Sequence, residues 1–241
     1  FLMNYYRNID RNKVQFDFIS IYDKLCFENE IKSLGGRVYK ICSEKVNPIK
    51  YCKQLEKIIR ENNYKIVHIN MLSAANILPV IVAKRQKIKH IIIHSHNSDT
   101  PSGLLRKLLN TLNKPFLHLG TDFFACSKLA GEWLFGKNFL KKHELKIINN
   151  AVDIDKYKFN AQTRENIRNE LECREKFVIG HVGRFCYQKN HDFLINVFYE
   201  VQKEDKDMIL LLIGEGELKE EIQEKVKKLN IQDNVIFLGT T

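Results

Sequence analysis

"FVIGHVGRFCYQKNHDFLINVFYEV", residues 177–201, is the stretch that decides the fold. It begins with a short apolar run that is typical of a buried strand and ends with an amphipathic run at helical spacing. Between the two runs lies a polar loop that carries Gly183, Arg184 and Lys189. A strand, a short loop and a helix in this order form the first half of a βαβ unit, which predicts an α/β fold with a parallel sheet.

The same alternation runs through nearly all of the 241 residues. Strand-like runs cover residues 14–20, 37–42, 65–71, 90–96, 122–127, 146–151, 177–182, 207–214 and 234–239, with helical patterns between most of them. Runs such as "HIIIH" and "MILLLI" are apolar throughout, as expected in a parallel sheet that is covered on both faces. We therefore expect two doubly wound, Rossmann-like domains, residues 1–150 and 151–241, joined near "NNAVDIDKYKFNAQ".

The composition is that of a globular protein with unevenly distributed charge. Hydrophobic residues make up 44% of the chain, and no apolar stretch approaches the roughly 20 residues of a membrane-spanning helix. Residues 1–150 carry 25 Lys and Arg against 12 Asp and Glu, whereas residues 151–241 carry 14 against 17. This asymmetry indicates domains with different partners, although a generally lysine-rich composition would also produce it. The six cysteines form no C-x-x-C pair, which favours reduced thiols in a cytoplasmic protein.

The loop after the first strand of the second domain is the strongest candidate site. Ligands of such sheets bind beyond the carboxyl ends of the strands. The N–H groups at the start of the next helix favour an anion there, and the guanidinium of Arg184 and the ammonium of Lys189 would add charge. Gly183 would let the backbone approach a bulky ligand. These features suit a diphosphate. The alternative is a pair of solvated surface cations beside a turn.

Two further loops follow predicted strands. "IGEGEL" places Gly214 and Gly216 after the most apolar strand, which is either a site of close approach to a nucleotide or a plain strand-to-helix turn. "HSHNS" places His94 and His96 on one face at the end of another strand. Neutral imidazoles there could hold sugar hydroxyls or phosphate oxygens, and buried structural histidines are the alternative.

The stretch "SGLLRKLLNTLNKPFLHLG" carries leucines at helical spacing with basic residues around them. Such a helix either packs its leucines against the core or lies on an anionic membrane surface. The leucines are Leu104, Leu105, Leu108, Leu109 and Leu112, and the basic residues are Arg106, Lys107 and Lys114.

Taken together, these motifs resemble the retaining glycosyltransferases of family 4, which have the GT-B fold of two Rossmann-like domains facing a cleft. "GHVGRFCYQKNHDFLINVF" is similar to that family's G-x-x-G-R…K-N-H segment, and "LLLIGEGELKEEI" and "NVIFLG" are similar to the segments after it. "HSHNS", "ACSKLAGEWLFG" and "IINNAVDIDKYKFN" resemble its polysaccharide-building branch. Six motifs in the family's order cover essentially the whole chain.

The resemblance implies roles for individual residues. Arg184, Lys189 and His96 would be catalytic, the two cations at the donor diphosphate and His96 at the donor sugar, with His94 as the alternative histidine. Four residues besides Gly183 would lie near the nucleotide: Gly214, Gly216, Glu217 and Leu218. Asn97, Asn150 and Asp153 would lie on the acceptor side or between the domains.

The resemblance also implies an activity. A sugar would move from a nucleotide-diphosphate donor, a UDP-sugar, to a saccharide acceptor, in particular a lipid-linked one, with retention of configuration. The process would be the synthesis of a capsule, an exopolysaccharide or another cell-surface glycan, at the inner face of the cell membrane. The cations would replace a metal, so neither a metal nor a separate cofactor is expected.

The chain departs from the family pattern at both ends. The family begins with a strand and a glycine-rich loop and carries a later E-x(7)-E motif, and neither is found here. We therefore expect an internal piece of a longer protein, with its second domain incomplete and no turnover on its own.

Two other functions share some of these features. A nucleotide-sugar 2-epimerase has the same fold but needs no acceptor. A basic nucleic-acid-binding module would use the charge of the first half, but it would need exposed aromatic residues among its cations. Tyr5, Tyr6, Phe16 and Phe18 instead lie in expected core elements, so nucleic acid is not expected as a partner.

Overall fold

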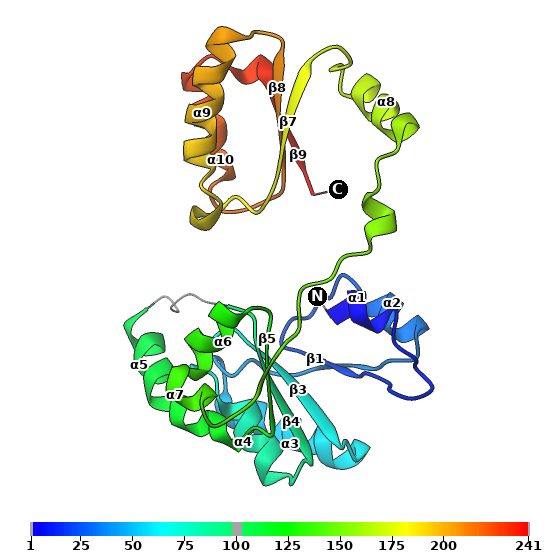
Figure 1. Cartoon of the computed structure of the whole chain (residues 1–241), viewed down its shortest axis with the longest axis vertical. Coiled ribbons are helices and arrows are strands. Elements are labelled where there is room, and N and C mark those ends of the chain that lie inside the picture. Colours follow the sequence, from blue (N-terminus) through cyan, green and yellow to red (C-terminus); the bar gives the residue numbers. More distant parts are fainter. Residues whose placement is uncertain (1, 98–102, 241) are drawn as a thin grey trace. The chain divides into compact units, whose positions relative to one another are not determined.

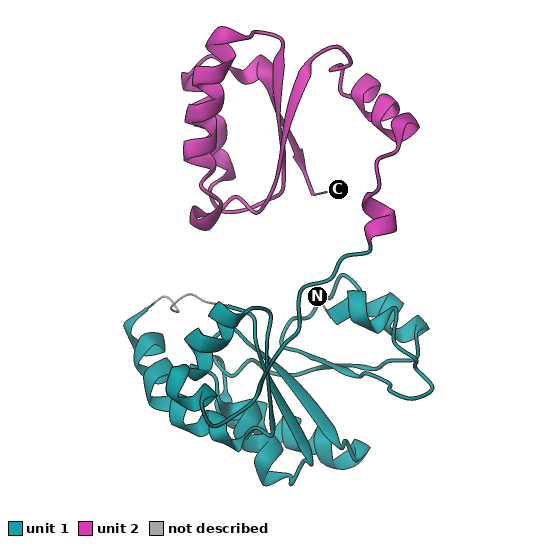
Figure 2. Ribbon diagram, in the orientation of Figure 1, with its two compact units in different colours: residues 1–153 teal, residues 154–241 magenta. Residues whose placement is uncertain are grey.

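The computed structural model describes residues 2–97 and 103–240, and these fall into two compact units (Figures 1 and 2). Unit 1 ends at Asp153 and unit 2 begins at Ile154. The division lies inside the segment that joins the two expected domains. Both units are α/β, and every pair of neighbouring strands described in them is parallel.

Unit 1 alternates strands and helices along most of its length. Its elements are α1 (Leu2–Tyr6), β1 (Phe18–Ser20), α2 (Glu28–Ser33), β2 (Val38–Lys40), α3 (Pro48–Asn62), β3 (Ile66–Met71), α4 (Leu78–Arg85), β4 (His90–Ser95), α5 (Leu104–Asn113), the 3-10 helix η1 (Lys114–Leu119), β5 (Asp122–Ala125), α6 (Lys128–Phe135), α7 (Lys137–Leu140) and β6 (Leu145–Ile147). The strands form a two-stranded sheet, β1-β2, and a four-stranded sheet of order β3-β4-β5-β6.

Helix α3 shows how local sequence sets an element. Asn47 caps it by accepting a hydrogen bond from the Lys50 backbone N–H at 2.9 Å, and Pro48 occupies the first turn, where no intrahelical N–H is needed. The helix ends before Asn63, which adopts the left-handed conformation that asparagine tolerates. Its apolar face buries Leu55 and Ile59, as the spacing of these residues predicts.

The core of unit 1 lies on one face of the four-stranded sheet. Ile69 of β3, Ile91 and Ile93 of β4 and Phe123 of β5 pack there against side chains of α3, α4, α6 and η1. A smaller cluster around the fully buried Tyr6 packs α1 and α2 on the two-stranded sheet. Because β3, β4 and β5 are parallel, their carboxyl ends lie at the same edge of the sheet.

Unit 2 repeats the pattern on a smaller scale. Its elements are η2 (Ile154–Tyr157), α8 (Ala161–Glu170), β7 (Phe177–Val182), η3 (Tyr187–Lys189), α9 (His191–Glu204), β8 (Met208–Ile213), α10 (Lys219–Lys228), η4 (Gln232–Asn234) and β9 (Val235–Gly239). The sheet has the order β7-β8-β9. α9 and α10 cover one of its faces, where Ile195, Phe198 and Ile222 pack on Leu210 and Leu212 (Figure 1).

Several elements differ from their sequence predictions. α4 begins at Leu78, five residues after the expected start, because Pro79 suits the first turn of a helix. The helix expected over residues 103–118 stops at Asn113, and a 3-10 helix follows that contains Pro115. α8 was not expected, although Asn160 caps it by accepting a hydrogen bond from the Thr163 N–H at 2.8 Å.

Four of the five leucines of α5 lie at the surface, so these four do not pack against the core of unit 1. Leu104 is 85% exposed, Leu105 67%, Leu108 53% and Leu112 57%. Leu109 alone of the five is half-buried, and the helix instead buries Asn110, whose side-chain oxygen accepts a hydrogen bond from the Ala74 N–H. Within the described part of the chain, no helix is long and apolar enough to span a bilayer.

Candidate functional site

In unit 2 two loops meet at the carboxyl edge of the sheet. The cationic loop, residues 183–189, follows β7, and the glycine loop, residues 214–218, follows β8. The Phe185 N–H donates to the Glu215 carbonyl at 3.0 Å, and the Leu218 N–H donates back to the Phe185 carbonyl at 3.1 Å. The two loops are therefore fixed to each other by their backbones, as a rigid binding site requires.

The glycines of the second loop have a packing role. Gly214 has φ +148°, and a Cβ there would lie 2.2 Å from the Gly183 carbonyl oxygen. Gly216 has φ +158°, and a Cβ there would lie 2.4 Å from the Phe185 carbonyl oxygen. Both positions exclude a side chain, because the cationic loop lies directly against them. The G-x-G pattern is thus explained by contact between loops, and nucleotide contact remains a prediction.

The two cations of the first loop have different surroundings. The Arg184 guanidinium donates to the Glu217 carboxylate at 2.8 Å, and both side chains are more than half exposed. This contact raises the pKa of Arg184, while the backbone N–H of Glu217 and then Arg184 lower the pKa of Glu217. The Lys189 ammonium forms no ion pair within residues 2–97 and 103–240, and its stem lies against Gly183. One cation is therefore already matched, and the other faces solvent.

The N-terminus of α9 lies directly after this loop. Asn190 precedes the helix in the left-handed conformation, with φ +49°. His191 is buried at the first helical position, stacked on Phe185 with 4.2 Å between ring centroids and edge-on to His181 at 4.7 Å. Burial first, then His181 and Lys189, lowers the pKa of His191. The neutral imidazole of His191 therefore packs against Phe185 of the cationic loop and adds no charge to the loop.

The second candidate region is the histidine cluster of unit 1, formed by His68, Asn70, His94 and His96. β3 and β4 pair in parallel with Asn70 opposite His94. The His68 Nε2 and His94 Nδ1 atoms lie 3.0 Å apart, and the rings of His94 and His96 lie 4.0 Å apart. The His96 Nε2 lies 2.7 Å from the Asn70 Oδ1. The cluster therefore joins the end of β3 to the end of β4.

All three imidazoles are held neutral. Burial, followed by His96, lowers the pKa of His68 to about 4. Burial, followed by His96 and His68, lowers the pKa of His94 to about 3. Burial also lowers the pKa of His96. Such a cluster can accept and donate hydrogen bonds at neutral pH, but it does not supply positive charge.

Sequence reasoning missed His68 and Asn70. Both lie on β3 at alternate positions of "VHIN", on the same face as His94, and the parallel register brings the two strands together. The signal was a polar pair inside an otherwise apolar strand, which is uncommon without a partner.

The remaining predicted residues lie elsewhere in unit 1. Asn97 follows the cluster, and its carbonyl accepts from the Ser95 hydroxyl at 3.4 Å. Asn150 is exposed in the segment after β6. The carbonyls of its neighbours Ala151 and Asn149 accept hydrogen bonds from Asn4 and Tyr5 of α1, respectively. Asp153 ends unit 1 and raises the pKa of Arg7 after the larger effect of Glu30. Of the predicted residues in unit 1, the structure thus brings His94 and His96 into contact, and Asn97 follows them directly in the chain.

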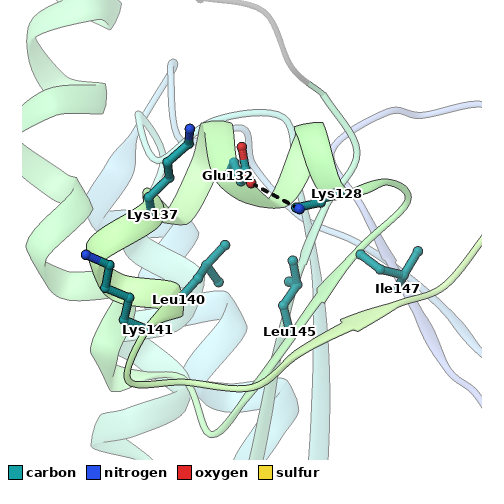
Figure 3. A pocket seen from close by; sticks show the side chains of 7 residues that line it. All are labelled: Lys128, Glu132, Lys137, Leu140, Lys141, Leu145 and Ile147. Carbon is teal, nitrogen blue, oxygen red and sulfur yellow. Dashed lines mark ion pairs between the residues drawn. The ribbon is translucent and has the colours of Figure 1, made fainter.

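Unit 1 also has a surface pocket of about 490 Å³ between α6, α7 and the edge strand β6 (Figure 3). Lysines and aliphatic side chains line it, with one carboxylate: Lys128, Lys137, Lys141, Leu140, Leu145, Ile147 and Glu132. Lys128 is 4.0 Å from Glu132, and neither of the other two lysines forms an ion pair inside the described ranges. The pocket combines an apolar floor with net positive charge.

A metal centre is not found among the residues that the structure describes, since no three His, Cys, Asp or Glu side chains are grouped to hold an ion.

Two α/β units, each built on parallel strands, are the architecture of the GT-B glycosyltransferases. In this chain the cationic loop lies at the carboxyl edge of the sheet of unit 2. The family follows from the sequence comparison. Residues 2–156 match the model described as Glycosyltransferase Family 4, and residues 163–241 match Glycosyl transferases group 1. The chain belongs to glycosyltransferase family 4.

Individual relatives agree with this assignment. The chain is 30% identical to the glycosyltransferase EpsF of Bacillus subtilis strain 168, over 99% of the chain and 64% of EpsF. It is 27% identical to the capsular polysaccharide biosynthesis glycosyltransferase CapH of Staphylococcus aureus, over 73% of the chain and 46% of CapH. The Anabaena protein HepE, solved in complex with UDP-glucose, has a TM-score of 0.68 at 17% identity, over 93% of the chain and 61% of HepE. The chain thus spans about half to two thirds of these proteins.

Proposed function

We propose that the chain belongs to a retaining glycosyltransferase that moves a sugar from a UDP-sugar to a lipid-linked saccharide during the synthesis of a capsule or another cell-surface polysaccharide. The observation that carries the proposal is the cationic loop, which places Arg184 and Lys189 beside the N-terminus of α9. Three sources of positive potential at one strand end suit a diphosphate.

The chemistry follows from where charge develops. The bond between the anomeric carbon of the sugar and the diphosphate oxygen breaks, and negative charge grows on that oxygen in the transition state. Arg184 and Lys189 stabilise this charge in place of a metal, because they are positioned before the reaction begins. The acceptor hydroxyl adds to the same face of the sugar, and the leaving phosphate oxygen takes its proton.

The other residues have supporting roles in this proposal. Gly183 lets the diphosphate approach the backbone, and the glycine loop with Glu217 and Leu218 lies beside the nucleotide. The donor base is assigned as uracil because HepE, which shares the fold, was solved with UDP-glucose. His96 faces the donor sugar, as in the family motif that "HSHNS" resembles.

The acceptor side is assigned to unit 1. The exposed leucines of α5 lie beside Arg106 and Lys107, which suits contact with an anionic membrane at its inner face. The lysine-lined pocket beside α6 offers an apolar floor to an anionic amphipathic molecule. Both features support a lipid-linked acceptor, and CapH is named for a polysaccharide pathway.

The test gives the full-length protein a panel of nucleotide sugars, with and without a polyprenyl-diphosphate-linked saccharide. Released nucleoside diphosphate and extended lipid are measured. A transferase releases UDP only with the acceptor present, and excess EDTA leaves the rate unchanged. An epimerase converts its donor without any acceptor. Release that is independent of the acceptor, or activity that returns only when a divalent cation is added back, contradicts the proposal.

A further inference from the structure

A pair of imidazoles joins the two ends of the cationic loop. His181 is the fifth residue of β7 and His191 is the first residue of α9, and the sequence of unit 2 contains no other histidine. Their rings meet edge-on with 4.7 Å between centroids, and His191 also stacks on Phe185 of the loop. The pair therefore connects the strand before the loop to the helix after it.

The nitrogens of this pair are buried without hydrogen-bond partners. Within residues 2–97 and 103–240, neither ring nitrogen of His191 has a partner, and the same holds for the His181 Nδ1. His191 is 2% exposed, so its nitrogens are shielded from bulk solvent. An unsatisfied buried polar group costs free energy, and a phenylalanine would stack on Phe185 without that cost. The imidazoles therefore need an explanation beyond packing.

Positive charge lies next to the pair. The His181 ring and the Lys189 stem both pack against Gly183, because a Cβ built there would lie 3.0 Å from the His181 Cε1 and 3.2 Å from the Lys189 Cδ. The N-terminus of α9 adds its own positive potential at His191. Burial, followed by His181 and Lys189, lowers the pKa of His191, so this ring is neutral at pH 7.

The carboxylates on the neighbouring elements are engaged by other cations. Asp192 follows His191 in α9, and the Lys225 ammonium of α10 contacts its carboxylate at 2.5 Å. Glu217 of the glycine loop pairs with Arg184 at 2.8 Å. Neither carboxylate therefore offers its full charge to the imidazoles.

A bound diphosphate would reverse this balance. In the proposed function it lies at Gly183 and Lys189, the two residues beside which the His181 ring packs. A ligand in contact with them is also close to the imidazoles, inside the roughly 8 Å over which charges interact at physiological salt, and buried groups are screened less than exposed ones. Negative charge at such a distance favours the protonated form of an imidazole.

We propose that His181 and His191 are a further part of the diphosphate site: donor binding at the cationic loop is accompanied by uptake of one proton from solvent, which the two imidazoles share. The proton adds a positive charge beside Lys189 while the donor is bound, and it returns to solvent when the diphosphate leaves. Contact between the rings limits the uptake to one proton, because two imidazolium charges would repel each other. The inference rests on the proposed function, since it needs an anion at the loop.

Calorimetry of the full-length protein with UDP-glucose measures the proton directly. Neither phosphate of this probe titrates near neutral pH, unlike the terminal phosphate of UDP, so buffers of different ionisation enthalpy report protons taken up by the protein. The complex holds a proton that the free protein lacks, so affinity should rise as pH falls. At pH 7 we expect uptake of about half a proton, which corresponds to roughly threefold tighter binding per unit decrease in pH.

Variants identify the source of the uptake. His191→Phe keeps a ring stacked on Phe185 but removes both nitrogens, so it should lower the uptake, and the addition of His181→Gln should abolish it. His96→Gln in unit 1 should keep the uptake, and so should His118→Gln at an exposed position. Uptake that survives in the double variant, or that is lost in His96→Gln, overturns the inference.

A second measurement is made on the unmodified protein, so that it does not depend on how the variants fold. In protein labelled with 15N-histidine, two-bond 1H–15N spectra distinguish neutral from charged imidazole, and the spectrum of His191→Phe identifies the His191 signal. Addition of UDP-glucose at pH 7 should shift the signals of the pair toward the charged form. If no nucleotide sugar of the panel binds, the proposed function fails and the inference fails with it. Binding without proton uptake overturns the inference alone.

Discussion

The cationic loop of unit 2 and the histidine cluster of unit 1 lie at the same place in their folds, the carboxyl end of parallel strands, but their environments are opposite. Arg184 and Lys189 are exposed and charged, whereas His68 is half-buried, His94 is buried and both imidazoles are neutral. The loop can stabilise negative charge, and the cluster can only exchange hydrogen bonds. One topology thus provides a charged loop and a neutral cluster, to which the proposed function assigns the leaving group and the donor sugar.

Removal of either cation from the loop should have the largest effect on turnover. In the full-length enzyme, Arg184→Ala and Lys189→Ala should each lower kcat by a hundredfold or more, because loss of one donor to a developing oxyanion costs about 3–4 kcal/mol. Arg174→Ala, an exposed arginine of the same unit that pairs with Glu165, should stay near the unmodified rate. Steady-state release of UDP measures all three. Near-normal rates in both loop variants would remove the diphosphate assignment.

The neutral cluster should make unit 1 sensitive to acid. The pKa of His68 is about 4 and that of His94 about 3, against an ordinary value of 6.5. Below pH 6.5 the unfolded chain binds protons that the folded chain does not, so stability is fully present above that pH and falls as pH drops toward 4. The loss should be on the order of a few kcal/mol.

Urea unfolding of the chain at pH 7 and pH 5 measures this loss. His94→Gln should flatten the pH dependence, although it lowers stability at pH 7 by about 1–3 kcal/mol because His68 loses its partner. His118→Gln, at an exposed position, is the matched control and should keep the slope. An equal slope in all three proteins would show that the cluster is not the source.

The glycine loop of unit 2 tests whether turnover depends on the position of the cationic loop as well as on its charge. Gly216→Ala would place a Cβ 2.4 Å from the Phe185 carbonyl oxygen at a φ that alanine rarely adopts. The expected cost is about 1–3 kcal/mol of stability, with a further loss of turnover as the cationic loop shifts. Gly180→Ala, in β7 with nothing within 4 Å of the added carbon, should be nearly neutral. Thermal unfolding compares the two, and equal melting temperatures would contradict the packing role.

The order of strands and helices was predictable from the sequence because apolar runs and amphipathic runs alternate with few exceptions. "FVIGHV" became β7, and the loop cations lie where the strand ends. α8 was missed because its residues lack an apolar stripe, and none of its side chains is buried. Its start depends on a local cap at Asn160.

The site was less predictable, because partners separated in sequence define it. Nothing in "GRFCYQK" or "GEGEL" states that Arg184 pairs with Glu217, 33 residues later. The parallel register of β3 and β4 likewise brings Asn70 to His96, and neither residue indicates the other in sequence. The exposure of the α5 leucines was one of two alternatives, since a stripe has the same spacing whether it faces a core or a membrane.

The basic surface of unit 1 should bind anionic lipid through α5. Lys107→Glu should weaken binding to vesicles of phosphatidylglycerol and phosphatidylcholine by fivefold or more, because each basic residue near such a surface contributes about 1 kcal/mol. Lys84→Glu, an exposed lysine on α4, makes the same change in net charge and should have a smaller effect. Cosedimentation at low salt measures both. Equal binding to vesicles of pure phosphatidylcholine would contradict the role of charge.

The smallest expected effect concerns the carboxylate that pairs with Arg184. Glu217 forms an ion pair with the Arg184 guanidinium, so a diphosphate must compete with this carboxylate. Glu217→Gln removes one negative charge and keeps the size of the side chain. Because both groups are exposed, we expect only about a two- to threefold gain in UDP affinity at low salt, and the gain should shrink as salt screens the charges. Glu215→Gln removes the same charge from the neighbouring pair with Lys219 and should gain less. Calorimetric titration at two salt concentrations compares them. Weaker binding in Glu217→Gln would mean that the carboxylate orients Arg184 for the ligand, and the ion pair would then be part of the site instead of a competitor.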